Sequence, residues 1–256
     1  MPIRIAIPMP HSSDPEYAER AIPQYERAVT LAGGVPVRIP LVRPDSEVRT
    51  LIAHCDGVLL PGSNADVDPA RFQQARSPHT AKSDPRRDEI DDLLLEDAYT
   101  QGKPVLGICY GLQSLNIFRK GSLIQHIPDF LPEATRTKIN HEAGKKIAIA
   151  HTVEIQPSSL LAKVVSKGGK GPKSEVRGPV IPVNSSHHQS ADAIGNGLHI
   201  VARCPDDGII EALEGTSKNH FVVAVQWHPE RSVEQDEPSL AIFKALIEAA
   251  AKRNGA

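Results

Sequence analysis

The most informative segment is residues 104–111, which read PVLGICYG. Its first five residues are apolar and suit one short buried strand that leads directly into Cys109. Residues 110–119 then carry apolar side chains at helical spacing. The stretch therefore predicts a strand, a tight turn at Cys109 and a helix. This is the setting in which a G-x-S-x-G motif, here with cysteine in place of serine, presents a nucleophile.

The same alternation of strand and helix patterns extends to both sides of this turn. Helical patterns occupy residues 16–32, 48–53, 88–101 and, near the end of the chain, about 238–253. Strand patterns occupy residues 3–7, 35–39, 57–60, 146–155, 198–203, 208–213 and 221–227. Such alternation is typical of an α/β fold in which helices cover both faces of a mostly parallel sheet. The second half is richer in strand patterns, so we expect extra β elements there.

One segment interrupts these patterns. Residues 166–179 are rich in glycine, lysine and proline, which favours a surface loop over a domain boundary. Apolar runs on both sides of this loop suit one shared core. We therefore expect a single domain over residues 1–256.

Composition and charge argue against several classes of protein. The chain has 256 residues and a formal net charge of −2, which gives no general attraction to nucleic acid or anionic membranes. Three cysteines are too few for a disulfide framework. The N-terminal residues lack the features of a signal peptide, and no apolar run reaches the about 18 residues of a membrane span. We expect a cytoplasmic protein without nucleic-acid or membrane partners, and a homodimer is left open.

Cys109 is the candidate nucleophile. Glycines at 107 and 111 flank it, as a strained turn requires because larger side chains would clash. A cysteine at a helix N-terminus lies in a partial positive charge that favours the thiolate over the thiol. The backbone N–H of Tyr110 would point to a developing oxyanion. The alternative is that Cys109 is a small buried residue at a strand end, which is how we interpret Cys55 and Cys204.

His228 is the candidate base. Residues 222–230 read VVAVQWHPE, so a buried strand delivers His228 to its end. Pro229 favours an extended backbone at His228, and side chains two residues apart in an extended segment point to the same side. Glu230 is then placed to hold the imidazole, as the third member of a catalytic triad does. A surface His-Pro-Glu turn is the open alternative.

These two motifs resemble those of a known family. Residues 107–113, GICYGLQ, and 226–230, QWHPE, are similar to the class I glutamine amidotransferase-like superfamily, and most similar to its γ-glutamyl-γ-aminobutyrate hydrolase family, also called peptidase C26. Further similar segments follow in the family's order at residues 60–69, 121–127, 151–155, 183–189 and 207–212. The resemblance implies a flavodoxin-like three-layer α/β sandwich and a hydrolase that cleaves γ-glutamyl amides.

The resemblance also implies roles for individual residues. It makes Cys109 the nucleophile, His228 the base and Glu230 the group that orients the base. It implies an oxyanion hole formed by the N–H groups of Gly62 and Tyr110. It implies a γ-glutamyl pocket lined by Gln113, Ser185, Ser186, His187 and His188. Ser63 departs from the family pattern because it stands where a second glycine is usual, which reduces the backbone freedom of that loop.

We expect neither a metal nor a cofactor. His187 and His188 are adjacent, so on an extended chain they point in opposite directions and do not easily share one ion. No cysteine or acidic residue stands beside them. The acidic stretch at residues 88–97 suits a solvated helix face better than a cation site.

The function expected from these features is hydrolysis of a γ-glutamyl amide to glutamate and an amine through a Cys109 thioester. The resemblance implies a place in polyamine catabolism, such as that of putrescine. The leaving amine stays open between aminobutyrate, another polyamine-derived amine and an aromatic amine. Two alternatives are a glutaminase subunit that supplies ammonia to a synthase partner, and a non-enzymatic scaffold on the same fold.

Overall fold

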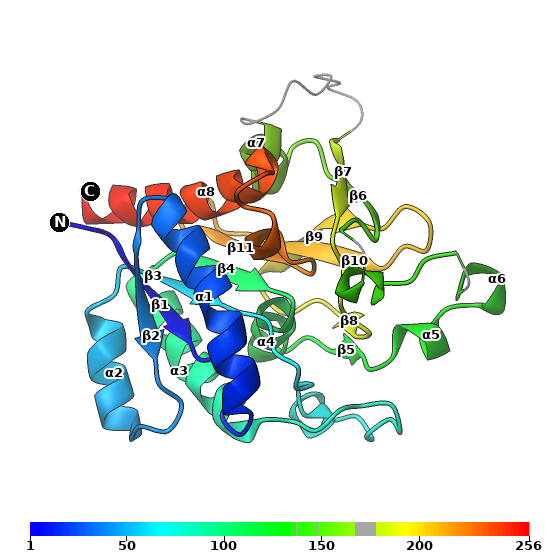
Figure 1. The fold of residues 1–256 in the computed structure, drawn as a ribbon, viewed down its shortest axis with the longest axis horizontal. Helices are drawn as coiled ribbons and strands as arrows, with labels where there is room; N and C mark the ends of the chain where they lie inside the picture. The colour runs from blue at the N-terminus through cyan, green and yellow to red at the C-terminus, as the bar shows by residue number, and fades with distance from the viewer. Residues whose placement is uncertain (137, 147, 167–177, 256) are drawn as a thin grey trace.

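The structure is a computed structural model, and it describes residues 1–136, 138–146, 148–166 and 178–255. Its centre is a nine-stranded sheet in the order β2-β1-β3-β4-β11-β10-β9-β6-β7 (Figure 1). Five neighbouring strands are parallel: β1 (Arg4–Pro8), β2 (Val35–Ile39), β3 (Gly57–Leu60), β4 (Val105–Ile108) and β11 (Val222–Val225).

The sheet continues with antiparallel strands from the second half of the chain. These are β10 (Ile210–Gly215), β9 (Leu198–Arg203), β6 (His151–Ile155) and β7 (Val180–Val183). A separate two-stranded ladder joins β5 (Leu123–Ile124) to β8 (Ser190–Ala191). The expected α/β class with extra β elements in the second half is confirmed.

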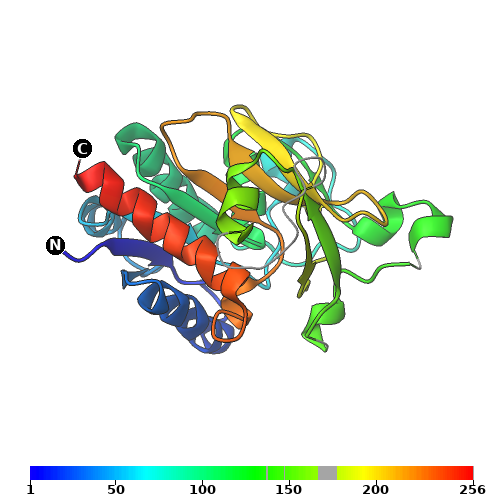
Figure 2. The same ribbon diagram turned by 90° about the horizontal axis from the view of Figure 1, so that it is seen from above.

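Helices cover both faces of the sheet (Figure 2). On one face lie α1 (Pro15–Leu31), α7 (Leu160–Ser166) and α8 (Glu237–Asn254). On the other lie α2 (Asp45–Ala53), α3 (Pro85–Gln101) and α4 (Tyr110–Phe118). The sheet residues alternate between the two cores: Ile5 and Ile7 pack on the α1 side, whereas Ala6 packs on the α2 side. This alternation follows from the two-residue repeat of a strand.

Helix starts follow from local sequence. Asp14 and Asp84 each precede a proline, and their carboxylates accept hydrogen bonds from the backbone N–H groups of Tyr17 (3.0 Å) and Arg87 (3.2 Å). An acidic cap followed by proline satisfies N–H groups that have no partner within the helix. The short helices α5 (Ile127–Phe130) and α6 (Glu133–Arg136) follow β5. Three 3₁₀ turns complete the described structure, at Pro69–Phe72, Ala143–Lys145 and Pro229–Arg231.

Most expected elements are found within a few residues of their predicted bounds. The strand expected at 146–155 is shorter than predicted and begins at His151. Most of the loop expected at 166–179 lies outside the described residues. Within the described part of the chain, no helix is both long and apolar enough to cross a membrane.

The sheet gathers three loops at one place. The strands β3, β4 and β11 are parallel neighbours, so their carboxyl ends meet at one edge of the sheet. Gly62 follows β3, Cys109 follows β4 and His228 follows β11. The backbone N–H of Cys109 donates to the Val225 carbonyl at 2.8 Å, which ties the β4 turn to the end of β11.

Candidate active site

Cys109 lies in a strained turn between β4 and α4. Its backbone has φ 53° and ψ −105°, a conformation that residues other than glycine rarely adopt. Such a conformation costs on the order of 1–3 kcal/mol and persists only where the surroundings enforce it. The side chain is buried, 6% exposed, at the N-terminus of α4. The strain and the helix terminus are those of a nucleophile presented by a strand–turn–helix.

The glycines around this turn are required by close packing. A Cβ on Gly111 would fall on the carbonyl oxygen of Leu60 and within 2.7 Å of its Cβ. A Cβ on Gly107 would lie 2.8 Å from the carbonyl oxygen of Gly111. A Cβ on Gly62 would lie 3.0 Å from His228 Cε1 and 3.6 Å from Cys109 Cβ. The loop after β3 therefore runs directly past both candidate catalytic side chains.

His228 and Glu230 form a buried pair. Nδ1 of His228 lies 2.7 Å from Oε1 of Glu230, and the two residues are 5% and 4% exposed. The segment is not extended as expected, because Pro229–Arg231 forms a 3₁₀ turn. This turn still brings Glu230 back onto the imidazole. The backbone N–H of His228 donates to Oδ1 of Asn184 at 3.0 Å, which anchors the end of β11.

The charges around His228 favour its protonated form. Burial by itself lowers the pKa of His228, but the negative charges of Glu230 and Cys109 outweigh it and raise the pKa to about 9. Since Nδ1 is held by Glu230, Nε2 is the ring nitrogen available to the sulfur and to a substrate.

Two tyrosines of α1 also border the site, although their spacing in the sequence indicated only a helix. Burial, and then the charge of Cys109, raise the pKa of Tyr17 to about 12, so its hydroxyl stays neutral. The Tyr25 hydroxyl accepts a hydrogen bond from the backbone N–H of Gly62 at 3.0 Å. The feature of the sequence that could have indicated this role is the hydroxyl group that each tyrosine adds to an otherwise apolar helix face.

The two expected oxyanion donors differ in this structure. The N–H of Tyr110 opens α4, where the first N–H groups have no acceptor within the helix. The N–H of Gly62 already donates to Tyr25. It therefore has to exchange this bond before it can hold an oxyanion, so both roles stay predictions.

The residues expected to line the γ-glutamyl pocket point in several directions. Gln113 is buried, with Nε2 3.4 Å from both the Gln189 carbonyl and Gln226 Oε1. Ser186 accepts a hydrogen bond from Arg231 at 2.7 Å. His188 pairs with Asp66, while Ser185 and His187 turn into a buried group of side chains. Their substrate-binding role stays a prediction.

The acidic stretch on α3 is only partly solvated, and that expectation was wrong for Asp88 and Asp91, which are 4% and 0% exposed. Asp91 is paired with the fully buried Arg87, whose Nε donates to it at 2.7 Å and whose Nη2 donates to the Pro61 carbonyl at 2.7 Å. Asp88 is paired instead with Arg71, at 2.8 Å. Tyr110 donates its hydroxyl to Asp88 at 2.5 Å. Arg87 thereby fixes the loop that leads into Gly62. Its spacing of four residues from Asp91 could have indicated an ion pair on one helix face.

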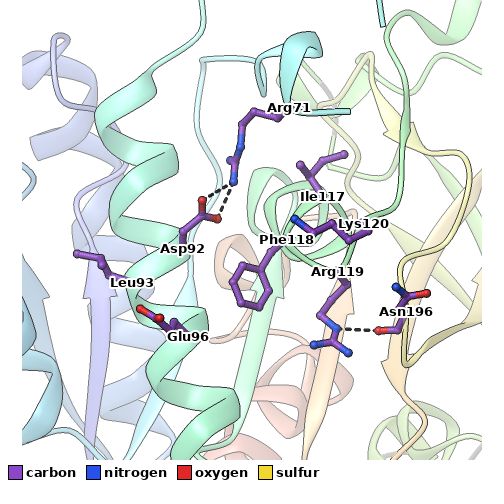
Figure 3. A pocket seen from close by; sticks show the side chains of 9 residues that line it. All are labelled: Arg71, Asp92, Leu93, Glu96, Ile117, Phe118, Arg119, Lys120 and Asn196. Carbon is purple, nitrogen blue, oxygen red and sulfur yellow. Dashed lines mark hydrogen bonds and ion pairs between the residues drawn. The ribbon is translucent and has the colours of Figure 1, made fainter. Parts of the chain in front are cut away.

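A separate pocket of about 660 Å³ opens over α3 and α4 (Figure 3). Figure 3 shows Arg71 bonded to Asp92 and Arg119 bonded to the Asn196 backbone, at distances of 2.6 and 2.7 Å. Its two arginines are therefore already engaged by protein groups. The described lining residues belong to a surface apart from the Cys109 turn.

Comparisons with known proteins show which family this chain is similar to. The sequence profile of peptidase C26 matches residues 5–230. RP404 of Rickettsia prowazekii (strain Madrid E), described as glutamine amidotransferase-like, is 32% identical over 92% of this chain and 90% of its own length. PuuD of Escherichia coli (strain K12), a gamma-glutamyl-gamma-aminobutyrate hydrolase, is 30% identical over 88% of this chain and 84% of its own length.

A solved structure from Thermoplasma acidophilum, described as a subunit of GMP synthase, has the same fold. Its TM-score is 0.64 at 16% identity, and the match covers 100% of this chain and 97% of that chain. The match to the family profile and the two relatives over most of the chain confirm the resemblance stated from the motifs. The chain belongs to the peptidase C26 family of glutamine amidotransferase-like hydrolases.

Proposed function

We propose that this chain hydrolyses γ-glutamyl amides to glutamate and an amine, with Cys109 as nucleophile, His228 as acid and base, and Glu230 as the group that orients His228. The observation that carries the proposal is the strained Cys109 turn beside the His228–Glu230 pair, whose Nδ1 and Oε1 atoms are 2.7 Å apart. A strained nucleophile, a base and an orienting carboxylate are the three parts that acyl transfer requires.

In the first half-reaction, the Cys109 thiolate attacks the γ-carbonyl carbon, and the carbonyl electrons move to oxygen. The N–H of Tyr110 holds this oxyanion, joined by the N–H of Gly62 once it leaves Tyr25. Each such donor stabilises the transition state by roughly 3–4 kcal/mol. His228 then gives the proton on Nε2 to the amine nitrogen as the C–N bond breaks, which leaves a γ-glutamyl thioester on Cys109.

In the second half-reaction, neutral His228 takes a proton from water as the water oxygen attacks the thioester carbon. The oxyanion forms in the same place and collapses as the C–S bond breaks. Glutamate leaves with a new carboxyl group, and the Cys109 thiolate and the His228 imidazolium are restored. Glu230 keeps Nδ1 protonated in both steps, so Nε2 always faces the reacting atoms.

The acyl half of the substrate is supported by the family and by the name of PuuD, a gamma-glutamyl-gamma-aminobutyrate hydrolase. The amine half includes aminobutyrate and other polyamine-derived amines, which would place the enzyme in polyamine catabolism. The buried cysteines of the described chain are all free, which supports a reducing compartment such as the cytoplasm.

A panel of γ-glutamyl amides, with glutamine included, tests the proposal. We expect turnover of at least one γ-glutamyl amide by the purified chain, none by a Cys109→Ala variant, and a γ-glutamyl mass adduct on Cys109 after rapid quenching. Hydrolysis of glutamine alone, and only after a synthase partner is added, would favour the ammonia-supplying subunit. Turnover by the Cys109→Ala variant at the rate of the unmodified chain would overturn the assignment of the nucleophile.

A further inference from the structure

Four buried side chains converge at the antiparallel end of the sheet. They are His141, His151, His187 and Glu211, and we call them the histidine–glutamate cluster. His151 begins β6, Glu211 lies in β10, and the other two come from loops beside these strands. Their exposed fractions are 6% or less, and that of Glu211 is 0%. Figure 1 shows β6 and β10 in this part of the molecule.

The distances within the cluster suit a shared ion better than hydrogen bonds. Oε1 of Glu211 lies 3.2 Å from His141 Nδ1, 3.4 Å from His151 Nε2 and 3.6 Å from His187 Nε2. Charge-assisted N–H···O bonds are shorter, about 2.7–2.9 Å. Ligands bound to zinc at 2.0–2.1 Å in a tetrahedron are themselves roughly 3.3–3.4 Å apart. The three observed separations, 3.2, 3.4 and 3.6 Å, lie around this ligand-to-ligand distance.

The outer nitrogen of each imidazole is held by an acceptor. His141 Nε2 lies 2.8 Å from Oδ2 of Asp207, and His187 Nδ1 lies 2.9 Å from the Gln189 carbonyl. His151 Nδ1 lies 3.0 Å from the Thr152 carbonyl. An N–H donated outward to a carboxylate or carbonyl leaves the lone pair of the other nitrogen pointing inward. Metal-binding histidines almost always have this arrangement.

The inward atoms are poorly satisfied by protein groups. Nδ1 of His141, Nε2 of His187 and both carboxylate oxygens of Glu211 have no hydrogen-bond partner among the residues that the structure describes. Buried polar atoms normally have one, so their gathering in one place requires an explanation. Nε2 of His151 differs, because it lies 2.7 Å from the Ser185 hydroxyl. That hydroxyl has to rotate away for His151 to bind an ion.

We propose that the histidine–glutamate cluster binds one Zn²⁺ ion in a tetrahedral structural site. Three imidazoles and one carboxylate are donors that zinc accepts, and four protein ligands without an open position are typical of a structural site. The sequence disfavoured a metal because His187 and its neighbour His188 point apart. They do diverge in the structure, but His187 instead meets residues distant in the sequence, among them the acidic ligand Glu211.

The proposed ion would steady a segment that reaches the active site. Asn184, Ser185 and His187 lie in one loop, between β7 and β8. The side chain of Asn184 accepts a hydrogen bond from the backbone N–H of His228. Zinc would tie this loop to β6 and β10. The proposal itself does not depend on the chemistry of Cys109, and its test measures metal binding directly.

The test uses the full chain carrying Cys109→Ala, so that the Cys109–His228 pair does not bind zinc. After treatment with a chelator and desalting, the protein is titrated with Zn²⁺ and, separately, with Co²⁺. We expect one Zn²⁺ per chain by elemental analysis, a rise in the melting temperature, and the intense visible absorption of tetrahedral Co²⁺. Absence of a saturable site, or a weak octahedral Co²⁺ spectrum at saturation, would overturn the proposal.

Two variants place the ion. In the Cys109→Ala chain, Glu211→Gln and His141→Gln should each weaken Zn²⁺ binding at least 100-fold. A matched control, His199→Gln, removes a half-exposed histidine of β9 and should leave the stoichiometry at one. Undiminished binding in both cluster variants would show that zinc is bound elsewhere and refute the site. If one variant fails to fold, Zn²⁺ binding by the other decides whether the ion lies in the cluster.

Discussion

Replacement of Glu230 by glutamine tests the electrostatic role of the triad most directly. The change keeps the shape of the side chain but removes the charge that lies 2.7 Å from His228 Nδ1. Burial by itself lowers the pKa of His228, and Glu230 is the largest contribution in the opposite direction. We therefore expect the pKa of His228 to fall from about 9 toward or below its ordinary value.

The magnitude follows from that pKa. A value of about 9, against an ordinary value of 6.5, corresponds to about 3 kcal/mol of preferential binding of the proton in the folded state. Because the folded pKa is raised, this stabilisation is complete below about pH 6.5 and is lost as the pH rises through about 9. The variant should lose most of this dependence. It should also be less stable at every pH by about 1–3 kcal/mol, because its new amide N–H₂ replaces an oxygen, Oε2, that has no buried partner among the described residues.

Urea unfolding of both proteins at a series of pH values between about 6 and 10 separates the two effects. A constant difference in the free energy of unfolding reports the effect of the amide group. A difference in the slope of that free energy against pH reports the changed pKa of His228. The rate of γ-glutamyl amide hydrolysis should fall as well, by up to about the 10⁴-fold that an amide costs at the equivalent place in a serine protease triad. A Glu234→Gln control removes a half-exposed carboxylate nearby and should change neither slope nor rate. Identical pH slopes for the unmodified chain and the Glu230→Gln variant would show that Glu230 does not raise the pKa of His228.

Three further predictions concern the nucleophile turn and its supports. Cys109→Gly should be more stable than Cys109→Ala by about 1 kcal/mol, because relief of a strain of about 1–3 kcal/mol exceeds the roughly 0.5–1 kcal/mol entropic cost of glycine. Gly111→Ala should lower the free energy of unfolding by about 3 kcal/mol, since the new Cβ falls on the Leu60 carbonyl. Arg87→Met should lower it by about 3–5 kcal/mol, because Asp91 is left buried without its cation. Chemical denaturation measures all three.

Two matched variants control these predictions. Gly255→Ala adds a Cβ whose nearest neighbour is at an ordinary 3.6 Å, so it should leave stability nearly unchanged. Arg49→Met breaks an exposed pair with Glu96 and should cost no more than about 1 kcal/mol. An equal loss in Gly111→Ala and Gly255→Ala, or in Arg87→Met and Arg49→Met, would contradict the packing argument. A Cys109→Gly variant less stable than Cys109→Ala would contradict the strain argument.

The features that depend on neighbours along the chain could be predicted from the amino-acid sequence. The two-residue and helical repeats predicted the strands and helices, with β2, β3 and β9 matching their expected bounds. The glycines beside Cys109 predicted its turn, because a tight strand-to-helix turn admits few other side chains. The short spacing between His228 and Glu230 likewise limited how far apart they could lie, even though the backbone between them is a 3₁₀ turn.

Which distant residues meet depends on tertiary packing. Arg87 reaches the carbonyl of Pro61 across 26 positions and pairs with Asp91, so part of the charged face expected to be solvated is buried. Glu211 meets three histidines from separate segments, so the comparison of His187 with its neighbour could not reveal a metal site. Burial and the direction of a side chain depend on how non-adjacent strands and loops pack. A repeat along the chain specifies the face that a residue occupies, but it does not specify the partner opposite that face.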